Sequence, residues 1–392
     1  MRARSLSLEP AAVPARPAAV AARTVLVLGA LPESLVVFRG PLMQAMIAHG
    51  HRVIACASGA STAVRARLAE LGVRYVDVPF RRTGLSPLRD LASLRALIGL
   101  MRAERPDMVL AYTIKPVVYG GLAARLTGRP EFFAMIEGVG YAFASRERAA
   151  WLAAMIARPL YRMTLAGASR VFFLNPDNLA LFARLGLLRS TRQAALLNGI
   201  GIDLDEFRPA PLPDQTSFLL IARLLTSKGI VEYVEAARLV KAKHPGVRFR
   251  LVGWIDEHPE AVREADLQTW IREGTVDFLG RLEDVRPAIA DCSVYVLPSY
   301  HEGLPRTVLE AMAMGRAIIT TDAPGCRETV VPGVNGRLVP VGDVPALAAA
   351  MESYLHDPTQ IARAGAASRS MAVQKYDVHA VNEMILRVME LA

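Results

Sequence analysis

Short apolar runs alternate with helical patterns in both halves of this 392-residue chain, and that alternation restricts its fold. β-Branched and aromatic residues fill the runs, which is typical of buried strands. The expected strands are Thr24–Leu28, Arg52–Ala57, Met108–Tyr112, Ser217–Ile221, Arg248–Val252 and Val294–Leu297. Strands separated by helices form parallel sheets that carry helices on both faces. Because 52% of the residues are apolar, the chain can fill two such cores. The sequence therefore predicts an α/β protein with two doubly wound, Rossmann-like domains.

A turn-rich stretch with three prolines divides the two halves. We place the linker near Arg208–Gln215, which gives domains at 24–209 and 210–375, and we expect a helix at about 376–392 to pack back on the first domain. Residues 1–23 are rich in Ala, Pro and Arg and lack the apolar core of a signal peptide, so a disordered tail is expected. No transmembrane helix is expected, because no uncharged apolar run reaches the roughly 18 residues that one needs.

The segment from Tyr300 to Asp322 predicts a binding site for an anion. A buried strand at Ser293–Pro298 leads into a turn that carries Glu302 and Gly303. A helix from Arg306 to about Met314 follows, with Pro305 at its expected first position, and a second strand comes after it at Ala317–Thr320. A glycine turn that leads into a helix N-terminus offers free backbone N–H groups and the positive end of the helix dipole. A phosphate group is the ligand that such a site suits best.

Two carboxylates flank this site. Glu302, on the turn, suits a ligand that carries sugar hydroxyls beside its phosphate. Glu310 lies on a helix that is apolar almost all round, and two interpretations stay open for it. It either forms a solvated stripe with Arg306 and Thr307, paired with Arg306 at i, i+4, or it binds ligand hydroxyls.

The run HEGLPRTVLEAMAMGRAIITTDAPGCRETV, continued by GVNGRLVP, resembles the donor-binding segment of retaining glycosyltransferases of family 4. The signature of that family is two glutamates separated by seven residues. The resemblance implies a GT-B fold, in which two Rossmann-like domains face each other across a cleft. It also implies that Glu302 contacts the transferred sugar and that Glu310 binds the ribose of the nucleotide. A second run, FLLIARLLTSKGIVEYVEAARLV, is similar to the pyrophosphate segment of the family, and this places Arg223 and Lys228 on the diphosphate. The guanidinium offers planar paired donors and the ammonium a mobile point charge, a combination that suits a diphosphate.

The resemblance implies a metal-independent reaction that retains the anomeric configuration. Charge that grows on the leaving diphosphate would be stabilised by Arg223, Lys228 and the N–H groups at 303–307. No Asp-x-Asp pair follows a strand of the second domain, and DLDE at 203–206 lies at the linker, so neither a metal nor another cofactor is expected. The further expected contacts to the nucleotide sugar are Gly303, Leu304, Thr307, Val308 and Arg281.

The first domain is similar to a subgroup of family 4 that builds capsule, O-antigen or glycoprotein glycans on a polyprenyl diphosphate. The similar runs are VFRGPLMQAMIAHGHRVIACAS, which places Phe38 and Arg39 just before the first helix, AYTIKPVVYGGLAARLTGRP and AMIEGVGYAF. This implies a lipid-linked saccharide acceptor, with Lys115 and Glu137 as candidates for its contacts, and action at the inner face of the cytoplasmic membrane. The loop GALPESLVVFRG lacks the double glycine of many relatives, so we assign no acceptor contact there.

Positive charge is concentrated in the first half of the chain. Through Pro209 the sequence has 27 Lys and Arg against 14 Asp and Glu, a net of +13, whereas the remainder has a net of −4. One segment combines Arg146, Arg148, Arg158 and Arg162 with an apolar face expected to contain Trp151, Leu152, Met155, Ile156, Leu160 and Tyr161. Such a segment suits an anionic bilayer or, alternatively, a helix packed on its own sheet with arginines at the rim. Nucleic acid is not an expected partner, because no recognised reading motif is present.

Other functions stay open at this point. A nucleotide-sugar 2-epimerase shares the two-domain plan, and a non-catalytic binder of lipid-linked saccharides would keep the basic half. A dinucleotide-dependent dehydrogenase is disfavoured, because the first strand ends in VLGALPES without the G-x-G-x-x-G pattern. Three cysteines without metal-binding spacing indicate reduced thiols in a cytoplasmic protein. A UDP-hexose or UDP-N-acetylhexosamine is the donor expected from the frequency of UDP in the family.

Overall fold

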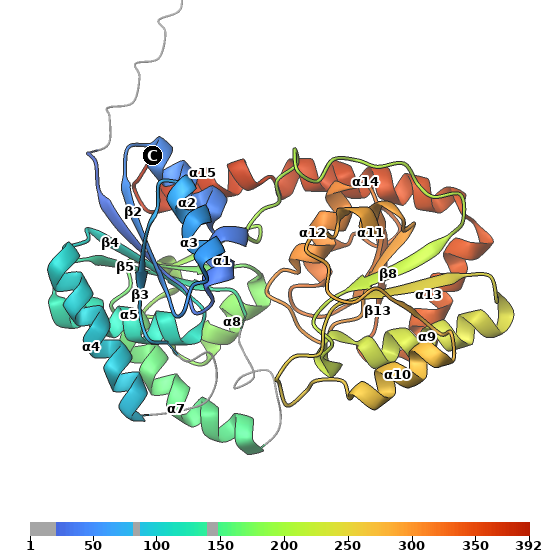
Figure 1. Ribbon diagram of the computed structural model, residues 1–392, viewed down its shortest axis with the longest axis horizontal. Coiled ribbons are helices and arrows are strands. Elements are labelled where there is room, and N and C mark those ends of the chain that lie inside the picture. The colour runs from blue at the N-terminus through green and yellow to red at the C-terminus, as the bar shows by residue number, and fades with distance from the viewer. Residues whose placement is uncertain (1–20, 81–86, 139–147) are drawn as a thin grey trace, which may run out of the picture.

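Two α/β domains lie side by side in the computed structural model, which describes residues 21–80, 87–138 and 148–392 (Figure 1). Each domain is built on one twisted sheet whose strands are parallel throughout the described residues. The six strands expected from the sequence are all present with the expected bounds. The predicted two-domain GT-B arrangement is confirmed.

The first sheet has seven strands in the order β3-β2-β1-β4-β5-β6-β7. Their bounds are β1 Thr24–Leu28, β2 Arg52–Ala57, β3 Arg74–Asp77, β4 Met108–Tyr112, β5 Glu131–Ile136, β6 Arg170–Phe173 and β7 Ala194–Leu196. The helices that cover this sheet are α1 Pro32–Val37, α2 Gly40–Ala48, α3 Thr62–Glu70, α4 Pro87–Glu104, α5 Ile114–Thr127, α7 Arg148–Leu165 and α8 Pro176–Arg184. β-Branched and other apolar side chains of the central strands are buried on both faces, as a parallel sheet between two helix layers requires.

The second sheet has six strands in the order β10-β9-β8-β11-β12-β13. Their bounds are β8 Ser217–Ile221, β9 Arg248–Val252, β10 Asp277–Phe278, β11 Val294–Leu297, β12 Ala317–Thr321 and β13 Gly336–Val339. The helices are α9 Ile230–Lys243, α10 Glu264–Arg272, α11 Arg286–Ala290, α12 Arg306–Ala313, α13 Val344–His356 and α14 Thr359–Lys375. Short 3-10 turns occur at 191–193, 226–228 and 327–329.

The final helix, α15 (Val378–Val388), returns to the first domain and lies beside α2 (Figure 1). The chain passes from the first domain to the second after β7 and returns just before α15. Ile202, in the first of these segments, exchanges backbone hydrogen bonds with Tyr376 and Val378 in the second. The ring of His51 contacts the carbonyl of Leu391 through Nε2 at 2.7 Å, so the end of the chain is held against the start of β2. The two domains are thus joined at two places along the chain.

Strand order reverses between β1 and β4 in the first sheet and between β8 and β11 in the second. Ligands of doubly wound folds bind at such points, beyond the carboxyl ends of the strands. The residues that follow these four strands line a shared cavity between the domains. No helix among the residues described is long and apolar enough to span a membrane.

Candidate active site

A cavity of about 700 Å³ lies between the two domains. The first domain contributes Ala30, Leu31, Ser34, Phe38, Tyr112, Thr113, Ile114, Lys115, Glu137 and Leu174. The second contributes Ile221, Ala222, Arg223, Lys228, Trp254, Leu297 and the stretch from Glu302 to Thr307, with Ile200 between the two sets. Most residues that the sequence assigned to donor and acceptor therefore line one space, although they come from loops spread across both halves.

Two predicted diphosphate cations enter this cavity from the end of β8. Arg223 donates to Asp256 at 2.8 Å, and the Asp256 side chain is 6% exposed. Lys228 ends a short 3-10 turn, and Gly229 follows it at φ +73° against the carbonyl of Pro298. A Cβ on Gly229 would lie 2.1 Å from that carbonyl oxygen, so the close approach requires glycine. This contact brings Lys228 next to the loop that follows β11.

Glu302 lies on that loop and pairs with Lys228. The distance between Lys228 Nζ and Glu302 Oε1 is 2.6 Å, and the Glu302 side chain is 13% exposed. The backbone N–H of Glu302 donates to Pro324 O at 2.9 Å. Beside it, Gly303 packs so closely on the backbone of Glu137 that no side chain fits at this position. The first domain therefore contacts the loop that holds the predicted sugar contact.

Glu310 is buried on α12, one turn behind the cavity wall. Its carboxylate accepts from Arg306 Nε at 2.9 Å, so the i, i+4 pair exists, but the Glu310 side chain is only 8% exposed. The solvated stripe considered from the sequence is therefore absent. Burial raises the pKa of Glu310, and the nearby Arg306 opposes that rise. The helix begins at Arg306, so Pro305 is its N-cap rather than its first residue.

Two predicted donor contacts lie away from the cavity wall. The Val308 side chain is fully buried in the core, and its N–H donates to Pro305 O at 3.1 Å. Because Val308 is on the inner face of α12, neither its side chain nor its backbone N–H is available to a ligand at the cavity wall. Arg281 stands next to the wall instead, with its guanidinium 4.7 Å from the centre of the Trp254 ring.

The two acceptor candidates line the first-domain side of the cavity, and each is part of an ion pair. Lys115 donates to Asp90 at 2.9 Å. Glu137 pairs with Arg39, which is almost fully buried and lies 4.5 Å from the centre of the Tyr112 ring. Burial raises the pKa of Glu137, and Arg39 lowers it to a smaller extent. Both candidates are thus fixed in place by partners within the first domain.

The prediction for the chain around Phe38 was wrong. Phe38 and Arg39 were expected just before the first helix, but α1 already precedes them at Pro32–Val37, and they lie between it and α2. The segment PESLVV was overlooked because it is a single short helix that starts at a proline. Phe38 lines the cavity, and the guanidinium of Arg306 lies 5.3 Å from the centre of its ring. Arg306 also donates to the carbonyl of Val37, so it connects the domains.

Several residues at the cavity were missed from the sequence. Trp254 and Asp256 follow β9, where no motif marks them, and their roles depend on pairing with side chains from other loops. Thr113, after β4, has φ +65°, which is rare for a β-branched residue and typical of strained functional loops. Its hydroxyl has no hydrogen-bond partner among the described residues. The sequence carries no signal for such a backbone angle at a threonine.

The basic segment predicted to be amphipathic forms α7, but its apolar residues do not share one face. Tyr161 is buried in the first-domain core, whereas Met155 and Ile156 are 55% and 47% exposed. Helical periodicity identified the segment but not which side meets the sheet. Arg158 and Arg162 are exposed beside the two apolar residues. Arg146 lies outside the described residues, as do the side chains of residues 148–154, including Arg148, Trp151 and Leu152.

Within residues 21–80, 87–138 and 148–392, no group of three or more His, Cys, Asp or Glu side chains is arranged to hold a metal ion. The three cysteines are buried and unpaired. Burial raises the pKa of Cys292 and Cys326 to about 12, so both thiols are protonated and unreactive at neutral pH.

Comparison with known proteins assigns the family. Residues 36–199 match the family described as "Glycosyl transferase 4-like domain", and residues 215–357 match "Glycosyl transferases group 1". The chain is 30% identical over 284 residues to the N,N'-diacetylbacillosaminyl-diphospho-undecaprenol alpha-1,3-N-acetylgalactosaminyltransferase of Campylobacter jejuni, covering 69% of this chain and 73% of that protein. The chain belongs to the family 4-like glycosyltransferases.

Further relatives of this glycosyltransferase agree with the assignment. It is 29% identical over 332 residues to the putative glycosyltransferase EpsD of Bacillus subtilis, covering 79% of this chain and 84% of that one. Its fold matches Anabaena HepE, solved in complex with UDP-glucose, with a TM-score of 0.76 over 94% of this chain and 100% of that one. Identity to HepE is 20%, so this likeness concerns the fold alone.

Proposed function

We propose that this glycosyltransferase moves a sugar, with retention of anomeric configuration, from a nucleotide diphosphate sugar to a polyprenyl-diphosphate-linked saccharide. The donor would be a UDP-hexose or a UDP-N-acetylhexosamine, and the product would belong to a surface polysaccharide or another glycan. The observation that carries the proposal is the shared cavity, in which cations from the second domain face polar side chains from the first.

The second-domain wall supports a nucleotide diphosphate sugar as the donor. Arg223 and Lys228 supply two cations where the diphosphate is expected, and the N-terminus of α12 adds backbone N–H groups and a favourable dipole. Glu302, held by Lys228, would accept from sugar hydroxyls, and the resemblance to the family motif assigns the ribose to Glu310.

Departure of the nucleotide is the step that these residues assist. As the bond between the anomeric carbon and the diphosphate oxygen breaks, negative charge grows on the diphosphate. Arg223 and Lys228 stabilise that charge without any metal ion. The acceptor hydroxyl attacks from the face that the diphosphate leaves, with its proton passing to the departing phosphate oxygen, so the configuration is retained and no protein nucleophile is needed.

The first-domain wall supports an acceptor that is brought to the cavity opposite the donor. Lys115 and Glu137 line that wall, and their ion pairs with Asp90 and Arg39 fix them there. The Campylobacter relative is named for an acceptor in which a saccharide is linked to undecaprenol through a diphosphate. A similar acceptor for this chain would place the enzyme at the cytoplasmic face of the membrane.

The outer face of α7 supports peripheral attachment to an anionic bilayer. Met155, Ile156 and Met163 are exposed apolar residues on this helix, and Arg158 and Arg162 alternate with them at helical spacing. Apolar side chains that enter the interface beside arginines that reach lipid phosphates are the features of an interfacial helix. The net charge of +13 through Pro209 adds to this attraction.

Release of UDP from a panel of UDP-hexoses and UDP-N-acetylhexosamines, with and without an undecaprenyl-diphosphate-linked saccharide, tests the proposal. Release that requires the acceptor and yields a lipid product longer by one sugar supports it. Conversion of the nucleotide sugar to its 2-epimer without acceptor would indicate the epimerase instead. Binding of the lipid-linked saccharide without turnover of any donor would indicate a non-catalytic binder.

A further inference from the structure

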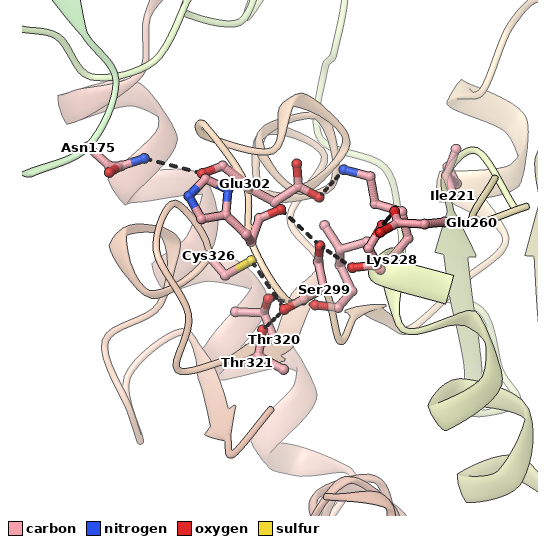
Figure 2. A network of polar contacts seen from close by, with 12 residues as sticks. Asn175, Ile221, Lys228, Glu260, Ser299, Glu302, Thr320, Thr321 and Cys326 are labelled. Carbon is pink, nitrogen blue, oxygen red and sulfur yellow. Dashed lines mark hydrogen bonds and ion pairs between the residues drawn. The ribbon is translucent and has the colours of Figure 1, made fainter. Parts of the chain in front are cut away.

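The N-terminus of α8 contacts the loop that carries Glu302 across the domain boundary. Asn175, the N-cap of α8, follows β6 in the first domain and is fully buried. Its Nδ2 donates to the carbonyl of Gly303 at 2.6 Å and to that of Glu302 at 3.2 Å. Figure 2 shows this amide reaching the backbone of Glu302 while the Glu302 side chain turns to Lys228.

The orientation of the Asn175 amide follows from its partners. Its Oδ1 accepts from the backbone N–H of Asn178 at 2.8 Å, which caps α8. Two carbonyls lie on the other side and require a donor. Only one assignment of the amide satisfies all three contacts, because a carbonyl oxygen cannot donate. Asparagine thus serves as a helix cap and as a donor across the boundary at the same time.

Neighbouring residues on the same turn add two more contacts between the domains. Asn178 Oδ1 lies 3.0 Å from Nε2 of His301, the residue before Glu302. Asp177 accepts from Arg327 at 2.6 Å. Burial lowers the pKa of His301, so its ring is neutral near pH 7. The loop is therefore held from the first domain at three successive residues, through the His301 ring and through the carbonyls of Glu302 and Gly303.

The second domain holds the same loop from below. Glu302 N–H donates to Pro324 O. The hydroxyl of Ser299, labelled in Figure 2, lies within donating distance of the carbonyls of Ser227 and His301. Thr321 donates to the carbonyl of Ser299 from β12. These contacts fix the ends of the loop within the second domain. The Asn175 amide then holds the backbone of Glu302 and Gly303, from which the Glu302 carboxylate extends.

We propose that Asn175 is a positioning residue for transfer, which sets the Glu302 carboxylate from the acceptor-binding domain. The inference rests on the proposed function of Glu302 as the contact to the transferred sugar. A loop fixed by both domains places this carboxylate correctly only when the domains are docked. The contact between Glu302 and the sugar therefore depends on the domain that binds the acceptor.

Two substitutions separate this role from helix capping. Asn175→Asp and Asn175→Ser both keep a good N-cap, but neither supplies an amide donor to the two carbonyls. The serine variant is neutral, so it covers the case in which the aspartate variant fails to fold. Ser61→Ala is the matched control, because it removes the N-cap of α3 in the same domain, away from the cavity.

The full chain is measured in two ways, by hydrogen exchange at residues 300–304 and by steady-state transfer. Both Asn175 variants should exchange faster at these amides and lose about tenfold or more in kcat, while affinity for UDP alone stays within about twofold. Ser61→Ala should lower thermal stability and leave both readouts unchanged. Unchanged exchange, or faster exchange with wild-type kcat, would overturn the positioning role. If wild type transfers from no UDP-sugar tested, the proposed function fails, and the exchange measurement still decides whether Asn175 holds the loop.

Discussion

Lys228 Nζ lies 2.6 Å from Glu302 Oε1, so the lysine expected on the diphosphate also holds the carboxylate expected on the sugar. The two residues come from different strand ends of the second domain, β8 and β11, which are neighbours in the sheet. In the proposed reaction, this one cation would lie beside both the diphosphate that leaves and the carboxylate that contacts the transferred sugar. Removal of this lysine should therefore affect turnover more than donor binding.

Lys228→Ala should lower kcat by roughly 10²-fold or more, the effect of losing one preorganised electrostatic contact of about 3 kcal/mol. An interaction that strengthens in the transition state lowers kcat when it is removed, whereas one that only holds the substrate raises KM. Steady-state kinetics at saturating donor checks this. Wild-type turnover in the variant would remove Lys228 from the mechanism.

Arg223→Lys should also be a poor enzyme, because an ammonium cannot reproduce the planar fork of a guanidinium. The Asp256 carboxylate orients that fork through a 2.8 Å contact. The same kinetic assay, with Arg272→Lys on the exposed surface of α10 as the control, measures the effect. A variant that matches wild type would show that a point charge is sufficient here.

Glu310→Gln should weaken donor affinity by roughly 1.5 to 3 kcal/mol, the value of a hydrogen bond to a charged group. Burial raises the pKa of the wild-type carboxyl above its ordinary value of 4.5, so it takes up a proton at a higher pH than an exposed glutamate. Donor affinity of the wild type should therefore fall as pH decreases toward that raised pKa, and the glutamine variant should lack this dependence. Calorimetry with UDP across pH decides it, and equal affinity and pH dependence in both proteins would argue against ribose binding by Glu310.

Chelation should leave transfer largely intact, since the diphosphate is assigned to Arg223, Lys228 and a helix N-terminus. The assay is turnover after dialysis against EDTA. Complete loss that Mg²⁺ or Mn²⁺ restores would contradict the metal-independent mechanism.

The pair of changes Arg158→Glu and Arg162→Glu on α7 should reduce flotation with anionic vesicles. Attraction between a basic face and lipid phosphates decreases with salt, because the Debye length is about 8 Å at physiological ionic strength. Arg272→Glu with Arg363→Glu is the control, because it changes the net charge equally on the exposed surface of the second domain. Equal flotation of the two double variants would place the membrane contact elsewhere.

The parts of this protein that could be predicted from sequence are those encoded locally. Strand bounds follow from short apolar runs, and Arg223, Lys228, Glu302 and Glu310 belong to two continuous motifs. Asn175 could not be found in this way, because its role depends on a contact between the N-cap of α8 in one domain and the loop after β11 in the other.

Errors in the expected exposure have a related cause. The periodicity of α7 and α12 identified two helices but not the neighbours that cover them. Tyr161 was expected to share one face with Met155 and Ile156 but lies in the core while they are exposed, and Glu310, for which a solvated stripe was one of two interpretations, is buried. Tertiary packing decides both, and no local pattern reports it.

Transfer of labelled sugar from a UDP-sugar into the lipid phase tests the central claim most directly. Wild type, supplied with an undecaprenyl-diphosphate-linked saccharide, should move the label into lipid that is longer by one sugar, and Glu302→Gln should transfer far less. Release of UDP with all the label left in water as free sugar would contradict the account, because that outcome describes a hydrolase rather than a transferase.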